Sequence, residues 1–151
     1  DHRDLHVRSR RQRQMCIRDS TKGVLRGLHY QLPPYTQAKL VRVIEGNVLD
    51  IAVDIRKSSP TFGQHVAVEL TGDNKHQLFV PHGFAHGFVV LSDSATFAYK
   101  VDNYFAPEHD RGIAFDDDQL KINWQLSAEE LKLSDKDRAN PSLANAKDLF
   151  E

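Results

Sequence analysis

Residues 48–55 read Val-Leu-Asp-Ile-Ala-Val-Asp-Ile, and this stretch is the clearest indicator of the fold class. Apolar residues occupy one set of alternate positions and more polar residues the other: Leu49, Ile51, Val53 and Ile55 against Val48, Asp50, Ala52 and Asp54. Because successive side chains of a strand point to opposite faces, the pattern predicts a β-strand with one buried and one more exposed face.

Similar short apolar patterns continue along the chain, over residues 39–44, 66–70, 77–80, 86–91 and 95–101. Glu45-Gly46-Asn47 predicts a hairpin turn into the strand at 48–55, and residues 71–74 turn the chain again. Turn signals about 8–12 residues apart favour an antiparallel sandwich or barrel over alternating β and α units. The fold class predicted is therefore all-β and antiparallel.

Helix is expected only near the C-terminus. Ser127 and Glu130 have the spacing of a capping box, in which each side chain satisfies a backbone N–H at the start of a helix. Pro141 is suited to start a second short helix that would run to Phe150.

The composition is that of one globular domain. The chain has 151 residues, 40% apolar and 27% charged, with a net charge of -1 that gives no reason to expect a nucleic-acid partner. A single cysteine, Cys16, excludes a disulfide framework and a thiolate metal cluster. No apolar run is long enough for a spanning helix and no secretory signal is evident, so a cytoplasmic protein without a membrane partner is expected.

Residues 1–20 differ from the rest. They hold six arginines against three aspartates, whereas residues 21–151 hold 14 basic and 18 acidic groups. The apolar residues of the first segment follow neither strand nor helix periodicity, which favours a disordered or foreign Arg-rich leader before a single domain at 21–151. A basic arm for RNA, DNA or phosphate is the alternative, but no aromatic residue is interleaved for stacking on bases.

Three segments, 24–31, 37–41 and 81–88, place charged or titratable residues among apolar ones. Burying such a group costs free energy unless it is paired, so each is either satisfied structurally or kept for chemistry. His29 could act as a general base near neutral pH, and Arg26 could bind a phosphate. Strict alternation would put these two on opposite faces, so both can line one cavity only if Gly27 allows a bulge or bend.

Two further residues suit the chemistry of an enolate. Lys39 shares a strand face with Val41 and Val43 and would place an ammonium at the rim of an apolar interior. Tyr99 shares a face with Phe97 and Val101, so its hydroxyl could point inward and donate a proton. An edge lysine and a core tyrosine are the structural alternatives.

The segment Pro81-x-Gly83-x-x-His86 resembles the second half of the cupin metal motif, but the first half, which supplies His-x-His and a glutamate, is absent. We therefore expect no catalytic metal, and His86 is better interpreted as a substrate donor or an orienting residue. Asp137 lies in the polar segment 133–137, and a carboxylate returned to His29 would fix its tautomer.

In this order, the motifs resemble those of the dTDP-4-dehydrorhamnose 3,5-epimerase family of cupin-fold enzymes. The matching segments are residues 23–31, 37–39, 50–56, 59–63, 81–88, 99–100 and 133–137. The resemblance covers residues 21–151 and implies a jelly-roll barrel.

The resemblance also implies roles for individual residues. His29 matches the catalytic base, Asp137 its carboxylate partner and Tyr99 the proton donor, while Lys39 would stabilise the enolate. The residues at substrate-binding positions are Arg26, Gln31, His86, Phe105, Asp110 and Lys136. Phe105 stands where the family often has a tyrosine that stacks on thymine, and Asp110 where a glutamate is common.

The implied reaction inverts C3 and C5 of dTDP-4-dehydro-6-deoxy-D-glucose, in dTDP-L-rhamnose synthesis, in a cytoplasmic homodimer without a cofactor. The family begins with a Phe-x-Asp-x-Arg-Gly-x-Phe-x-Glu segment that contributes to substrate binding and dimer packing, and residues 1–20 do not match it. Without it, a sheet edge would be left uncovered. The alternatives are an epimerase acting at C3 or C5 only, a truncated non-catalytic sugar-nucleotide binding module, and a metal-dependent cupin oxygenase.

Overall fold

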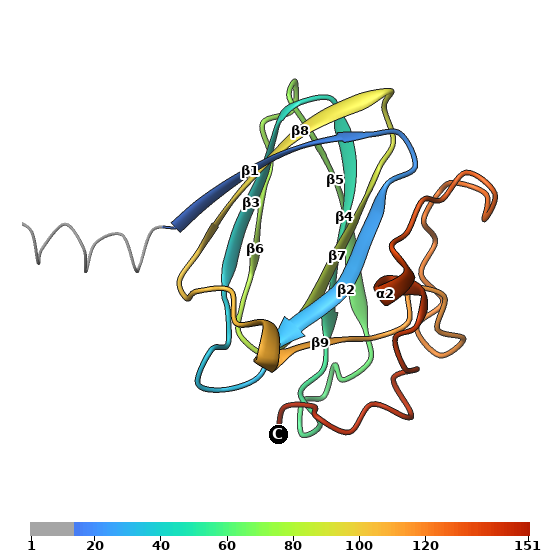
Figure 1. The fold of residues 1–151 in the computed structure, drawn as a ribbon. Helices are drawn as coiled ribbons and strands as arrows, with labels where there is room; N and C mark the ends of the chain where they lie inside the picture. Colours follow the sequence, from blue (N-terminus) through green and yellow to red (C-terminus); the bar gives the residue numbers. More distant parts are fainter. Residues whose placement is uncertain (1–13) are drawn as a thin grey trace, which may run out of the picture.

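The structure is a computed structural model that describes residues 14–151 (Figure 1). Two antiparallel sheets face each other. The strands are β1 (Gln14–Thr21), β2 (Leu25–Gln31), β3 (Lys39–Glu45), β4 (Asn47–Asp54), β5 (His65–Thr71), β6 (Gln77–Val80), β7 (Phe84–Val90), β8 (Ser94–Val101) and β9 (Asp110–Gly112). One sheet has the order β1-β8-β3-β6 and the other β5-β4-β7-β2-β9. The predicted all-β jelly-roll barrel is confirmed.

Consecutive strands lie in different sheets, except β4 and β5, which pair within the five-stranded sheet. The turn at Gly46 leads from β3 in one sheet to β4 in the other, so the hairpin predicted there is wrong, and β5 to β6 and β7 to β8 cross in the same way.

The domain has two apolar cores, one on each face of the five-stranded sheet. Val48, Phe88 and Phe97 belong to the core between the sheets, where the rings of Phe88 and Phe97 stack with centroids 4.4 Å apart. Leu49 and Ile51 belong to the other core, which the C-terminal segment covers. Strand β4 is therefore buried on both faces, not on one as its alternation predicted.

The C-terminal segment forms an irregular layer on the outer face of the five-stranded sheet (Figure 1). Its one α-helix is α2 (Asp135–Arg138), and a 3-10 helix, η1 (Pro107–His109), precedes β9. Neither predicted helix forms: Ser127 and Glu130 bond to each other within a turn, and residues 141–150 contain a turn at 143–145 but no helix. Buried Asp117 instead fixes the layer, because its carboxylate accepts the backbone N–H groups of Gln119, Leu120 and Leu143.

Part of the segment predicted to be a disordered leader forms a strand. Residues 14–20 were expected to be part of a disordered leader, but Gln14–Thr21 form β1 and pair with the whole of β8. Backbone hydrogen bonds between paired strands do not require alternating apolar side chains, so this segment can form a strand although its sequence lacks that alternation. Residues 1–13 lie outside the described part. Within residues 14–151, no helix has the length and apolar character that crossing a membrane would need.

Candidate active site

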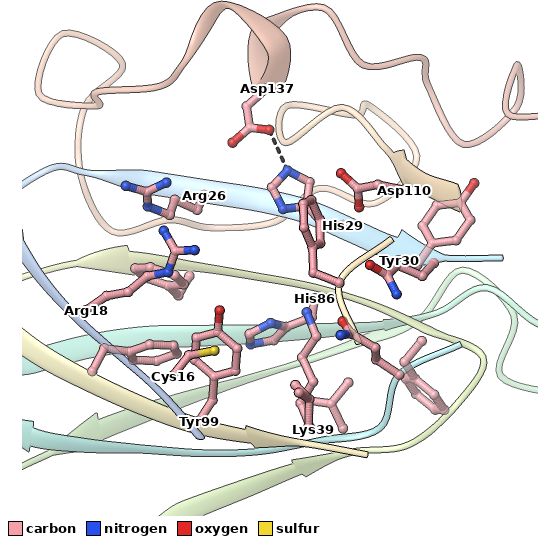
Figure 2. Close-up of a pocket in the computed structure, with 18 of the residues that line it drawn as sticks. Cys16, Arg18, Arg26, His29, Tyr30, Lys39, His86, Tyr99, Asp110 and Asp137 are labelled. Carbon is pink, nitrogen blue, oxygen red and sulfur yellow. Dashed lines mark hydrogen bonds and ion pairs between the residues drawn. The ribbon is translucent and has the colours of Figure 1, made fainter. Parts of the chain in front are cut away.

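A cavity of about 370 Å³ opens at one end of the barrel, and all ten predicted site residues line it. Figure 2 shows His29 and Arg26 reaching in from β2, and Tyr99 and Lys39 from the opposite sheet. Side chains distant in sequence thus converge on a single space, as the motif analysis expected.

Gly27 makes the first part of this arrangement possible. The pairing of β2 with β7 shifts register between Arg26 and His29, so both side chains reach the cavity. Gly27 has a φ of +125°, and a Cβ atom there would lie 2.6 Å from the Cα atom of Gly87. The predicted bulge is confirmed, and only glycine fits its backbone.

His29 is paired with Asp137. Its Nε2 atom lies 2.5 Å from Asp137 Oδ1, and the other carboxylate oxygen accepts the Gly27 N–H at 3.2 Å. The Ser134 hydroxyl accepts the Asp137 N–H and so caps the short helix that carries the carboxylate. Because a carboxylate only accepts, Nε2 carries the proton and the Nδ1 lone pair is left to act as a base.

The pKa of Asp137 reflects this pairing. Burial alone would raise it, but the hydrogen bond and charge of His29, with smaller effects of the Gly27 N–H and Lys136, hold the pKa below its usual value. The carboxylate is therefore ionised at neutral pH and places a negative charge beside His29.

Tyr99 and Lys39 enter from β8 and β3. Burial raises the pKa of Tyr99, an effect that Arg18 opposes, so the phenol keeps its proton at neutral pH. Burial lowers the pKa of Lys39, while the charges of Asp50 and Asp110 counteract it. The two groups can supply a proton and a positive charge to the same ligand.

Asp50, which the motifs did not indicate, is the hydrogen-bond partner of the cavity residue His86. His86 Nε2 lies 2.7 Å from Asp50 Oδ1, and the exposed fractions of the two side chains are only 7% and 0%. The second oxygen, Asp50 Oδ2, is buried without a hydrogen-bond partner among the described residues. The sequence did place Asp50 within an apolar strand, but the alternation of that strand assigned its face to solvent.

The remaining predicted residues lie around the mouth. Lys136 Nζ donates to Asp110 Oδ2 at 2.6 Å. Phe105 is 61% exposed, so its ring is free to receive a ligand. Gln31 is almost fully buried, and its amide bonds to backbone groups.

A comparison of the sequence with family models matches the model described as dTDP-4-dehydrorhamnose 3,5-epimerase over residues 3–145. The chain belongs to this epimerase family. A Shigella flexneri dTDP-4-dehydrorhamnose 3,5-epimerase is 58% identical over 118 residues, which are 78% of this chain and 64% of that protein. The chain thus spans about two thirds of the length of curated relatives that it matches.

Solved structures of epimerases have the same fold. The Legionella pneumophila dTDP-6-deoxy-D-glucose-3,5-epimerase, in complex with dTDP-4-keto-L-rhamnose, has a TM-score of 0.88 and 51% identity, covering 91% of this chain and 73% of that chain. A 3′-monoepimerase from Streptomyces bikiniensis, in complex with dTDP, has a TM-score of 0.81 and 29% identity, covering 95% and 78%. Similar folds therefore serve both double and single epimerases.

Among residues 14–151, no three His, Cys, Asp or Glu side chains gather closely enough to hold a metal ion. The two histidines that line the cavity are each bonded to an aspartate instead.

Proposed function

We propose that this chain converts dTDP-4-dehydro-6-deoxy-D-glucose to dTDP-4-dehydro-L-rhamnose by inverting C3 and C5, without a cofactor. The ketone at C4 acidifies the hydrogens on both neighbouring carbons. Removing a proton and returning one to the opposite face changes configuration but not oxidation state, so no electron acceptor is needed.

Each proposed role follows from the chemistry of a side chain. His29, through Nδ1, removes the proton from the sugar carbon, and Asp137 stabilises the imidazolium that forms. Lys39 stabilises the negative oxygen of the enolate. Tyr99 donates a proton to the other face; the phenolate is then reprotonated from solvent, and the His29 imidazolium releases its proton to solvent. Arg26, His86 and Lys136 bind the diphosphate and sugar, and Phe105 at the mouth stacks on the base.

One observation supports the proposal most. His29 and Tyr99 come from opposite sheets and line the same cavity, so a flat ketosugar between them would have a base on one face and an acid on the other. The relatives named above, one of them solved with dTDP-4-keto-L-rhamnose, support the choice of substrate.

Incubation with dTDP-4-dehydro-6-deoxy-D-glucose in deuterated water, followed by NMR, tests the proposal. We expect deuterium at C3 and C5 and the signals of the L-rhamno product. Deuterium and inversion at one carbon only would instead assign a single-site epimerase, which the similarity to the Streptomyces bikiniensis 3′-monoepimerase makes the second candidate. Binding of dTDP without any exchange would leave a non-catalytic sugar-nucleotide binding module.

We propose further that the protein is a cytoplasmic homodimer that binds neither nucleic acid nor a membrane. Leu40 and Phe79 lie opposite each other on β3 and β6, and both are exposed, at 37% and 61%. These apolar side chains support self-association through the four-stranded sheet. Light scattering coupled to size exclusion is expected to give twice the chain mass, and a monomer at micromolar concentration would contradict the dimer.

A further inference from the structure

Gln31, at the end of β2, has nearly all of its hydrogen-bonding capacity committed to the backbone. Its Nε2 atom donates to the carbonyl oxygens of Tyr35 at 2.7 Å and Tyr104 at 3.0 Å. Its Oε1 atom accepts the Ala106 N–H at 2.9 Å. Both N–H donors are therefore used, so Gln31 has none to offer a ligand in this arrangement.

Two of these bonds lie on either side of Phe105. The Tyr104 carbonyl precedes Phe105 and the Ala106 N–H follows it, so one side chain holds the backbone of the residue that carries the exposed ring. Gln31 itself is only 3% exposed, and its backbone pairs with Asp110 of β9, so the residue is well anchored.

Other side chains also hold residues 103–106 against residues 33–37. No backbone-to-backbone hydrogen bond joins residues 33–37 to residues 103–106 in the described structure. Gln37 Nε2 donates to the Asn103 carbonyl at 2.8 Å, and Asn103 Nδ2 donates to the Pro34 carbonyl at 2.9 Å. Gln31 is the member of this set that bonds directly to both neighbours of Phe105.

We propose that Gln31 is a positioning residue that fixes the Phe105 ring for the nucleobase of the substrate, and so sets the affinity for the nucleotide half rather than the rate of proton transfer. This inference rests on the proposed function. A base bound against an aromatic ring gains roughly tenfold to hundredfold in affinity when the ring is in place. Without the bonds of Gln31, binding would have to order the 103–106 segment first, and part of that gain would be lost.

Calorimetric titration with dTDP tests the inference on Gln31→Leu, Gln31→Glu, Phe105→Ala and the double variant Gln31→Leu/Phe105→Ala. Gln31→Glu keeps the size and the acceptor but loses both donors. We expect each Gln31 variant to weaken dTDP binding about tenfold. In the Phe105→Ala background, Gln31→Leu is expected to weaken it no further, because the ring to be positioned is gone. KM should rise while kcat changes little.

The matched control is Gln77→Leu, the same exchange at an exposed position of β6. It should leave the dTDP affinity as in the unaltered protein. Thermal unfolding monitors folding, and Gln31→Glu serves alone if Gln31→Leu does not fold.

Three outcomes would overturn the inference while leaving the proposed function in place: unchanged dTDP affinity in the Gln31 variants, equal losses with and without Phe105, or a fall in kcat at constant KM. Failure of the unaltered protein to bind dTDP would overturn the proposed function, and this inference with it.

Discussion

His29 and Asp137 are 108 residues apart in the chain, yet the Nε2 atom of one lies 2.5 Å from the Oδ1 atom of the other. The pair joins β2, inside the barrel wall, to α2 in the irregular C-terminal layer. That layer therefore does more than cover the outer apolar core, because it supplies the carboxylate that orients the candidate base.

Replacing Asp137 by asparagine is expected to reduce kcat by about 10²-fold or more. An amide can donate to His29 Nε2 and favour the tautomer in which Nδ1 is protonated and unable to act as a base. Steady-state turnover of the dTDP-ketosugar measures the effect. Asp135→Asn, an exposed position in the same helix, is the control and should keep normal turnover. Normal turnover in Asp137→Asn would remove the carboxylate from the mechanism.

Tyr99→Phe should separate proton removal from proton return. Turnover is expected to fall by about 10²–10⁴-fold, because the acid on the far side of the ring is lost. His29 can still remove a proton and return one to the same face, so deuterium exchange without inversion should persist in deuterated water. His29→Ala should abolish both exchange and inversion. Near-normal epimerisation in both variants, with folding intact by circular dichroism, would rule out these roles.

The alkaline limit of kcat/KM is expected to report Lys39 rather than Tyr99. Burial lowers the pKa of Lys39 and raises the pKa of Tyr99, and both shifts favour loss of the lysine proton before the phenol proton as pH rises. As pH rises, the enzyme form with a charged lysine and a protonated phenol is therefore lost at a pH lower than the ordinary pKa of lysine. Lys39→Arg, which stays charged, should move the limit to higher pH. An unchanged limit in that variant would assign the titration to another group.

Gly27→Ala should impair both stability and activity. A methyl group would overlap the backbone of Gly87, and relief of the overlap would move His29 and Arg26. Gly63→Ala is a matched control: φ there is +78°, but the nearest atom to a new Cβ is 3.5 Å away. The control should cost about 1–2 kcal/mol for its left-handed backbone.

Chemical denaturation and turnover assays compare the Gly27→Ala and Gly63→Ala proteins. The Gly27→Ala protein should lose more unfolding free energy than the Gly63→Ala protein, and should also lose turnover. Equal losses of stability with full activity in both variants would show that the bulge does not depend on glycine.

Asp54 is expected to make the domain sensitive to acid. Hydrogen bonds from Arg56, with others from Ser59 and Thr61, hold the pKa of the Asp54 carboxyl far below its ordinary value, against the effect of burial. A lowered folded-state pKa stabilises the protein above the unfolded-state pKa of about 3.9, and this stability is lost as pH falls further.

Urea unfolding at neutral pH and at about pH 3 measures this contribution. Asp54→Asn should be less stable at neutral pH and should lose less on acidification, because the titrating group is gone. Asp73→Asn, at an exposed turn, should behave as the unaltered protein. A parallel fall in all three proteins would assign the acid sensitivity to other groups.

Much of the site could be predicted from residue types alone. Charged or titratable residues among apolar ones, such as Lys39 and His29, need partners or a function, and both line the cavity. The conflict between alternation and a shared face for Arg26 and His29 even required the bulge at Gly27, which the structure contains. Their catalytic roles stay predictions.

Other features could not be predicted, because they depend on what lies across each sheet. Asp50 was assigned to the more exposed face of its strand, but it is fully buried and bonded to His86. The Glu130 carboxylate accepts the Ser127 N–H, which is one of the two bonds of a capping box, but the Glu130 N–H donates to the Ser127 carbonyl in a turn and no helix follows.

The order of apolar, polar and turn residues by itself determined that this protein is an antiparallel β-domain and which polar side chains need partners, because side-chain alternation and turn chemistry are local properties. Only the tertiary structure decided that the chain crosses between sheets at Gly46, that β4 has no exposed face, and that the Asp137 carboxylate, which the resemblance paired with His29, reaches it from the C-terminal layer. These depend on packing between segments far apart in sequence, which local periodicity does not encode.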